Sequence, residues 1–183
     1  PTSPSNRAEV DEPVEVVPYD PAWPVAFEAE REALTAALGS AAVAVEHFGS
    51  TAVPGLAAKP VVDVLVGLRS YPPPARALAA LARLGYEDLG EAGVPSRHYC
   101  RKRPAEGVAF NAALVLYDGP VWADNLAVRD YLRAHPAEAE QYAAVKRASA
   151  GPAVRLLAYS DRKGPFVTAL AARARGWVGS GAA

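Results

Sequence analysis

The chain has 183 residues, of which 51% are hydrophobic and 21% charged, and its formal net charge at neutral pH is −1. A nearly neutral chain has no general electrostatic attraction for nucleic acid or for an anionic membrane. No run approaches the roughly 18 apolar residues of a membrane-spanning helix, and a single cysteine, Cys100, excludes an internal disulfide. We therefore expect one cytoplasmic globular domain with a sizeable core, monomeric or weakly dimeric.

The first part of the chain predicts a leader, a short strand and a helix. Residues 1–13 are polar and show no periodicity, so we expect a disordered leader. Residues 14–17 are expected to form a short edge strand. Asp20 followed by Pro21 is typical of a helix start, and Gly39 is typical of the residue after a helix end.

The remaining elements follow from hydrophobic periodicity and turn residues. Strands are expected at 42–48, 61–68, 86–89, 97–102 and 108–117. Helices are expected at 72–84, 121–134, 137–150 and 161–177, with a flexible tail at 179–183. The pattern predicts one α/β (α+β) domain over residues 14–178: a mixed β-sheet with packed helices and a helical C-terminal region.

The loop at 49–60 and the strand after it carry the residues of greatest chemical interest. Asp63 lies inside an apolar run, where a lone carboxylate is costly to bury unless a cation or hydrogen-bond donors satisfy it. The turn Gly49-Ser50-Thr51 offers backbone N–H groups and hydroxyls, as a phosphate site requires. Lys59 could neutralise a phosphate as a point charge. A buried Asp that caps loop amides, beside an ordinary turn, would explain the same residues without any ligand.

Residues 46–63 read EHFGSTAVPGLAAKPVVD, and this segment resembles the hallmark of the GrpB family. Further matches lie at Tyr19–Phe27, at 93–102 and at 129–146, so the likeness spans roughly residues 14–173. The resemblance implies a nucleotidyltransferase-like fold. In that superfamily a Gly-Ser turn holds a triphosphate, and acids on a D-x-D strand bind magnesium.

Two departures from the family pattern weaken the case for catalysis. The second acid of the D-x-D pair would fall at Leu65, which cannot bind a metal. Many relatives also carry two histidines on a central strand, where this chain has Asn111 and Ala113. Asp118, Asp124 or Asp161 could supply another acid, and nothing in the sequence selects among them.

The strand at 97–103 adds a group of cations. Arg97, Tyr99, Arg101 and Arg103 share one face of it, while His98, Cys100 and Lys102 share the other. Guanidinium groups on one face could hold a phosphate or a carboxylate bidentately. A solvated edge strand protected by its charges would look the same.

Together these features predict a protein that binds a nucleotide or a phosphorylated small molecule, with transfer of a nucleotidyl group to a small acceptor as its possible reaction. The expected catalytic residues are Asp63 and Lys59, with Asp63 as the Mg²⁺ ligand. The expected ligand contacts are Gly49, Ser50, Thr51, Arg97, Arg101, Lys102, Arg129 and Lys146. Two alternatives stay open: a catalytically degenerate module that binds an anion or a protein, and an enzyme of different chemistry on this scaffold. The sequence shows no Cys-His zinc pattern and no Walker loop.

Overall fold

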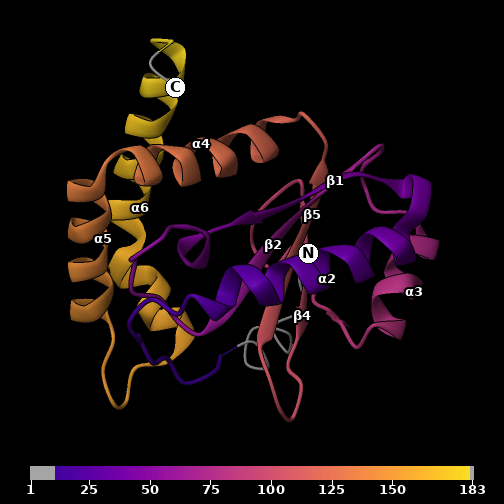
Figure 1. The fold of residues 1–183 in the computed structure, drawn as a ribbon, viewed down its shortest axis with the longest axis horizontal. Helices are drawn as coiled ribbons and strands as arrows, with labels where there is room; N and C mark the ends of the chain where they lie inside the picture. Colours follow the sequence, from indigo (N-terminus) through magenta and orange to yellow (C-terminus); the bar gives the residue numbers. More distant parts are fainter. Residues whose placement is uncertain (1–10, 182–183) are drawn as a thin grey trace.

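The computed structural model describes residues 11–181 (Figure 1). Its α-helices are α2 (Ala22–Leu38), α3 (Ala75–Arg83), α4 (Pro120–Ala134), α5 (Pro136–Ser149) and α6 (Leu156–Gly179). Its strands are β1 (Ala42–Phe48), β2 (Val61–Leu68), β3 (Glu87–Asp88), β4 (Arg97–Lys102) and β5 (Ala109–Leu116). Two short 3₁₀ turns, η1 (Gly39–Ala41) and η2 (Ser50–Ala52), flank β1.

The strands form one mixed sheet in the order β1-β2-β5-β4-β3. The two central strands, β2 and β5, are parallel, and every other pair is antiparallel. Their register places Asp63 opposite Asn111 on one side and opposite Phe48 on the other. The mixed α/β class expected from the sequence is confirmed.

One face of the sheet is covered by α2 and α3; in Figure 1, α2 crosses it in the foreground and α3 lies at the right. Alternate strand residues point into this core, among them Val62, Val64, Val66, Cys100, Ala112 and Leu114. Trp23, Phe27 and Leu34 of α2 meet them. Because side chains alternate along a strand, Asp63, Leu65 and Asn111 belong to the opposite face.

The opposite face is only partly covered by the helices that gather on one side of the molecule (Figure 1). Trp122 of α4 packs over Leu65, Ala113 and Val115. Gly67 makes this packing possible, because a Cβ there would lie 2.8 Å from the Trp122 ring. Around Asp63, a cavity separates the rest of this face from the first half of α6.

The loop at 49–60 is anchored in a separate apolar cluster. Val53 and Leu56 pack with side chains of α4, α5 and α6, including Tyr131, Tyr142 and Leu170. The loop therefore joins the sheet to the helical C-terminal region.

Most predicted elements are confirmed, and three of them are corrected. The strands at 42–48, 61–68 and 97–102 have the predicted bounds. The expected strand at 14–17 is wrong: its Val17 makes one isolated bridge with Ala58, and Pro13, just before it, makes another with Arg155. This segment pairs with the start of α6 and with the 49–60 loop, so it never reaches the sheet. The last helix begins at Leu156 rather than near 161, and the helix expected at 72–84 is shorter, at Ala75–Arg83.

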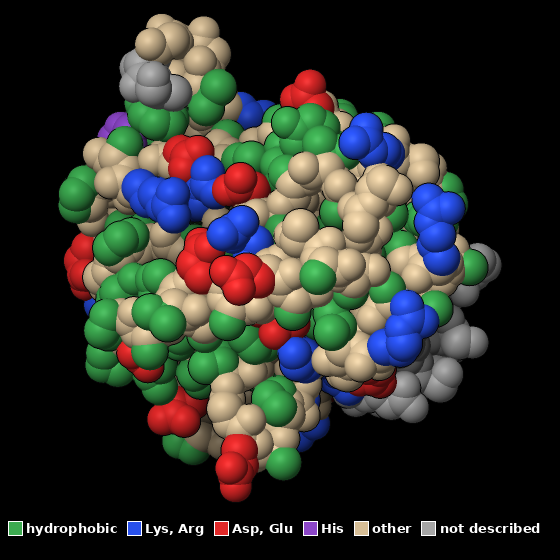
Figure 2. Space-filling model, turned by 45° about the vertical axis from the view of Figure 1, so that its right-hand side comes forward, with side chains coloured by type: hydrophobic (Ala, Val, Ile, Leu, Met, Phe, Trp, Pro, Cys, Tyr) green, Lys and Arg blue, Asp and Glu red, His purple; other side chains and the backbone are tan. Residues whose placement is uncertain are grey.

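The ends of the chain fall largely outside the described part. Residues 1–10 of the expected leader and residues 182–183 of the expected tail lie outside the described residues. At the start of the described part, Asp11 pairs with Arg155 and Glu12 with Arg103. Within residues 11–181 no helix is both long enough and apolar enough to cross a membrane. On the face shown in Figure 2, acidic and basic side chains are interspersed with apolar ones.

Candidate functional site

A cavity of about 630 Å³ lies between the sheet and α6. The sheet contributes Asp63, Asn111, Tyr99 and Arg97, and the loop before β2 contributes Lys59. The first half of α6 and the segment before β4 close the other sides, with Leu89, Ala92, Gly93, Val94, Leu156, Leu157, Ser160, Asp161, Lys163, Gly164, Val167 and Thr168.

Asp63 is held by a chain of hydrogen bonds that begins near the N-terminus of the described part. Asn111 Nδ2 donates to Asp63 Oδ1 over 2.8 Å. Arg103 Nη2 donates to Asn111 Oδ1 over 2.9 Å, which fixes the orientation of the amide. Glu12 accepts from the same guanidinium at 2.9 Å. The carboxylate of Asp63 therefore sits in a fixed position at the cavity wall.

The electrostatics around Asp63 reflect burial opposed by cations. Burial raises the pKa of the Asp63 carboxyl, while the Asn111 hydrogen bond and the charges of Lys59, Lys163 and Arg103 oppose that rise. Burial lowers the pKa of Lys59 and of Lys163, and in each case Asp63 opposes the change. One carboxylate is thus shared among several cations.

Three cations of the cavity wall have no carboxylate of their own. Lys59, Lys163 and Arg97 form no ion pair with any residue of the described chain, 11–181. The Nε of Arg97 is buried and has no hydrogen-bond partner there, although its guanidinium lies 5.0 Å from the centre of the Tyr99 ring. Burial lowers the pKa of Arg97 as well. A buried donor without a partner is costly, so an acceptor placed at Arg97 Nε would be stabilising.

Gly49 contacts Asp63 more closely than any other residue type could. Its φ is +69° and its ψ is −165°, a backbone conformation that side chains avoid. A Cβ built at Gly49 would lie 2.5 Å from Asp63 Oδ2. The glycine of the Gly-Ser turn is therefore required by the position of Asp63 itself.

The two hydroxyls of the predicted phosphate turn are directed into the protein and do not line the cavity. Thr51 is 1% exposed, and its Oγ1 lies 2.9 Å from Nε2 of the buried His47. Ser50 is half-buried and is a hydrogen-bond partner of Tyr142. The turn at 53–56 has type II features: Leu56 N donates to Val53 O over 3.1 Å, and Gly55 has a φ of +79°.

Two helical cations expected to contact ligand instead hold the 49–60 loop and β1. Arg129 Nη1 donates to the carbonyl of His47 over 3.1 Å and pairs with Glu46 at 2.8 Å. Lys146 is 1% exposed and donates to the carbonyl of Ala57. Buried carbonyls need donors, and these side chains provide them. Neither side chain lines the Asp63 cavity, and the ligand contacts expected of Arg129 and Lys146 stay predictions.

The cations of β4 divide between the two faces of the sheet, as the alternation predicts. Lys102 pairs with the buried Glu30 of α2 at 2.8 Å, on the face away from Asp63. Arg101 pairs with Glu87 of β3 at 2.7 Å. Neither lines the cavity, so of the predicted β4 contacts only Arg97 does.

On the α6 side of the cavity, sequence reasoning named only Asp161, as one of three possible further acids. Ser160, Lys163, Gly164 and Val167 follow the spacing i, i+3, i+4 and i+7, which places them on one helix face. A face that mixes a serine and a lysine with small and apolar residues is a usable signal of a polar cavity. The expected helix at 161–177 already contained Lys163, Gly164 and Val167, but no local pattern indicated that this helix faces Asp63 across the cavity.

The side chains around Asp63 fit Mg²⁺ poorly by themselves. Mg²⁺ requires nearly octahedral oxygen coordination, but in residues 11–181 Asp63 belongs to no group of three metal-ligating side chains. Leu65 is fully buried beneath Trp122, so the missing acid has no open space there. Of the candidate acids, Asp161 lines the cavity, whereas Asp124 pairs with Arg175.

Comparison with known proteins places this geometry in a family. The model of the family described as GrpB protein matches residues 13–173. The chain belongs to the GrpB family. A crystal structure of the conserved protein GrpB from Enterococcus faecalis matches it with a TM-score of 0.78 and 36% identity, over 87% of this chain and 96% of that one.

Sequence relatives of the family support the same assignment. UPF0157 protein YqkA of Bacillus subtilis is 35% identical over 136 residues, and UPF0157 protein PA4798 of Pseudomonas aeruginosa is 40% identical over 145. These alignments cover 73% and 76% of this chain, but only 39% and 58% of those proteins. A partial match, 36% over 88 residues, joins 46% of the chain to 22% of a dephospho-CoA kinase of Mycolicibacterium paratuberculosis.

Proposed function

We propose that the cavity around Asp63 binds a nucleotide or a phosphorylated small molecule through its unpaired cations. The observation that carries the proposal is the convergence of Lys59, Lys163 and Arg97 on one cavity without an ion pair among the described residues. Against these three positive charges the cavity wall sets two carboxylates, Asp63 and Asp161. An anionic ligand would balance the site and give the buried guanidinium an acceptor.

The roles of the residues follow from their positions. Arg97 would hold phosphate oxygens through its planar fork, while Lys59 and Lys163 would supply point charges from opposite walls. Asp63, fixed by Asn111, would keep the two lysines charged despite their burial and orient them toward the ligand. The partial match to a dephospho-CoA kinase supports a phosphorylated ligand only weakly, because it covers a small part of that protein.

Mg²⁺ enters this proposal only together with the ligand. Mg²⁺ is often bound by one or two carboxylates and the phosphates of a substrate, and here Asp63 and Asp161 are the available carboxylates. The chain's own residues would bind the phosphates without it. We therefore expect the affinity for the anion to depend weakly on Mg²⁺ and strongly on Lys59.

Transfer of a nucleotidyl group is the second candidate function, in keeping with the nucleotidyltransferase-like fold that the family implies. The observation that favours it is Asp161 of α6, a second carboxylate that lines the same cavity as Asp63. Magnesium-dependent turnover of ATP or GTP in the presence of small acceptors would support it. Binding without turnover would leave an anion-binding module.

Isothermal titration of ATP, GTP and pyrophosphate tests the proposed function. Arg97→Gln and Lys59→Gln should each weaken binding about 10- to 100-fold, since a charge-assisted hydrogen bond contributes about 1.5–3 kcal/mol. The matched control is Arg83→Gln, which removes an exposed charge from α3 on the other face of the sheet. Equal losses in all three variants, or no binding of any phosphate compound by the unmodified chain, would contradict the proposal.

A further inference from the structure

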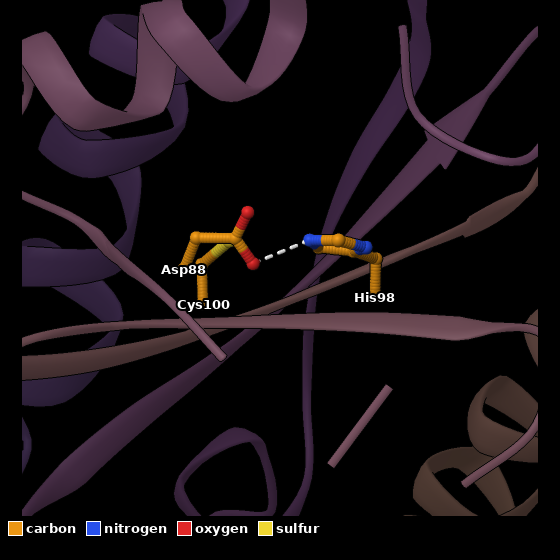
Figure 3. A group of neighbouring side chains, drawn as sticks. All are labelled: Asp88, His98 and Cys100. Atoms are coloured by element: carbon orange, nitrogen blue, oxygen red, sulfur yellow. Dashed lines mark hydrogen bonds and ion pairs between the residues drawn. The ribbon is translucent and has the colours of Figure 1, made fainter. Parts of the chain in front are cut away.

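A second group of chemically active side chains lies at the outer edge of the sheet, on the face away from Asp63. Register pairs Asp88 of β3 with Cys100 of β4. His98 lies two residues before Cys100, so the two side chains share a face. The possible ligand atoms of Asp88, His98 and Cys100 all lie within 4.8 Å of one another. Figure 3 shows the Asp88 carboxylate and the His98 ring pointing toward each other.

We propose that Asp88, His98 and Cys100 form a site for Zn²⁺ or a similar divalent transition-metal ion. A carboxylate, an imidazole and a thiolate are the three ligand types that Zn²⁺ accepts, and a site with three protein ligands leaves the fourth position to water. The thiolate makes the set unsuited to Mg²⁺, which prefers oxygen alone. Among residues 11–181 no other group of three such side chains occurs.

The distances are close to those that an ion would impose. Zinc–ligand bonds of about 2.0–2.3 Å place tetrahedral ligands roughly 3.3–3.8 Å apart. The distance from His98 Nε2 to Asp88 Oδ1 is 2.5 Å, so this pair would open by about an ångström to admit the ion. The other two separations are at most 4.8 Å, so each would close by no more than about 1.5 Å. Small side-chain rotations accomplish both changes.

The surroundings favour entry of an ion from one side. The side chains of Asp88 and His98 are 49% and 16% exposed, whereas Cys100 is 1% exposed. Solvent can therefore reach the site past the carboxylate, while the sulfur is shielded by the core. Gly90 N donates to Asp88 Oδ1 over 2.9 Å, which orients the carboxylate from behind. On binding, the sulfur–metal bond replaces the S–H bond and the proton passes to solvent.

An ion at this place would clamp β3, which has only two residues, to β4. The segment between them forms part of the Asp63 cavity, through Leu89, Ala92, Gly93 and Val94. The clamp would hold this wall without contacting the cavity's ligand. The site is independent of the proposed function, because it uses no residue assigned there.

Titration with Co²⁺ and competition by Zn²⁺ test the site. The chain contains a single cysteine, so a thiolate-to-cobalt charge-transfer band can come only from Cys100. We expect that band to saturate at one equivalent and to be displaced by Zn²⁺ but not by Mg²⁺. His98→Gln should weaken Co²⁺ binding by at least about 100-fold, because it removes one of three ligands.

His135→Gln is the matched control, since it removes a different histidine at the α4–α5 junction and should leave the titration unchanged. Asp88→Asn provides a second ligand variant at an exposed position and should also weaken binding. The proposal is overturned if no thiolate band appears, or if His98→Gln and His135→Gln bind Co²⁺ equally well. Either result would leave Asp88 and His98 as an ordinary ion pair beside a buried thiol.

Discussion

Replacement of Gly49 by alanine tests the close contact between the Gly-Ser turn and Asp63. The new Cβ would lie 2.5 Å from Asp63 Oδ2 and 3.1 Å from its Cβ and Cγ. Asp63 lies on β2, which is hydrogen-bonded to strands on both sides and cannot shift to relieve the contact. The φ of +69° adds backbone strain of order 1–3 kcal/mol. Displacing the carboxylate would also disturb its charge-assisted hydrogen bond with Asn111, worth about 1.5–3 kcal/mol. We expect the free energy of unfolding to fall by about 3–5 kcal/mol.

Gly55→Ala separates the two contributions. Gly55 also has a positive φ, +79°, but a Cβ there would meet nothing within 4 Å. Gly55→Ala should therefore lower the free energy of unfolding only through backbone strain, by about 1–2 kcal/mol. Urea unfolding of both variants at one pH gives the comparison. If Gly49→Ala costs no more than Gly55→Ala, the turn does not pack against Asp63 as described, and the reasoning is refuted.

Two further predictions concern the supporting side chains. Arg103→Gln should lower the free energy of unfolding by about 1–3 kcal/mol because Asn111 loses a buried partner. The control Arg155→Gln breaks a more exposed pair with Asp11 and should cost under about 1 kcal/mol. Similar losses of the two variants in urea unfolding would argue against the chain of hydrogen bonds that leads through Arg103 and Asn111 to Asp63. Burial lowers the pKa of Lys146 from 10.5 to about 7. Between these two pH values the unfolded state binds more protons than the folded state, so the free energy of unfolding should rise from pH 7 toward pH 10.5. Lys146→Met should flatten that rise when the free energy of unfolding is measured in urea at several pH values. If the free energy of unfolding varied with pH in the same way in both proteins, the pKa of Lys146 would not be lowered.

Much of the fold followed from the sequence because its strands are strongly apolar. Continuous runs such as Val61–Leu68 predict a strand buried on both faces, and the turn residues around them fix its ends. The strand predicted at 14–17 was wrong because the local sequence does not show whether an extended segment lies beside a free edge of the sheet. Here it passes the 49–60 loop instead, where Val17 pairs with Ala58.

The candidate site was predictable in part. Asp63, Lys59 and Arg97 were identified from the resemblance and from strand alternation, and all three line one cavity. Arg129 and Lys146 matched family positions equally well, yet they hold carbonyls of the backbone, a role that sequence cannot distinguish from ligand binding.

Residues contributed by distant segments were the least accessible to sequence reasoning. Lys163 reaches the cavity only because α6 folds across the sheet. Asp88 joins His98 and Cys100 only through the register of two antiparallel strands, so no short ligand spacing marks that group. In both cases the tertiary structure, rather than any local pattern, creates the chemistry.

The affinity of the Lys59→Gln/Lys163→Gln double variant for ATP in EDTA tests the central claim most directly. We expect the unmodified chain to bind ATP without a divalent ion, and the double variant to bind at least about 100-fold more weakly. The variant should remain folded, because burial lowers the pKa of both lysines and neither forms an ion pair within the described chain. Unchanged affinity in a folded double variant, or ATP binding that strictly requires Mg²⁺, would contradict the account.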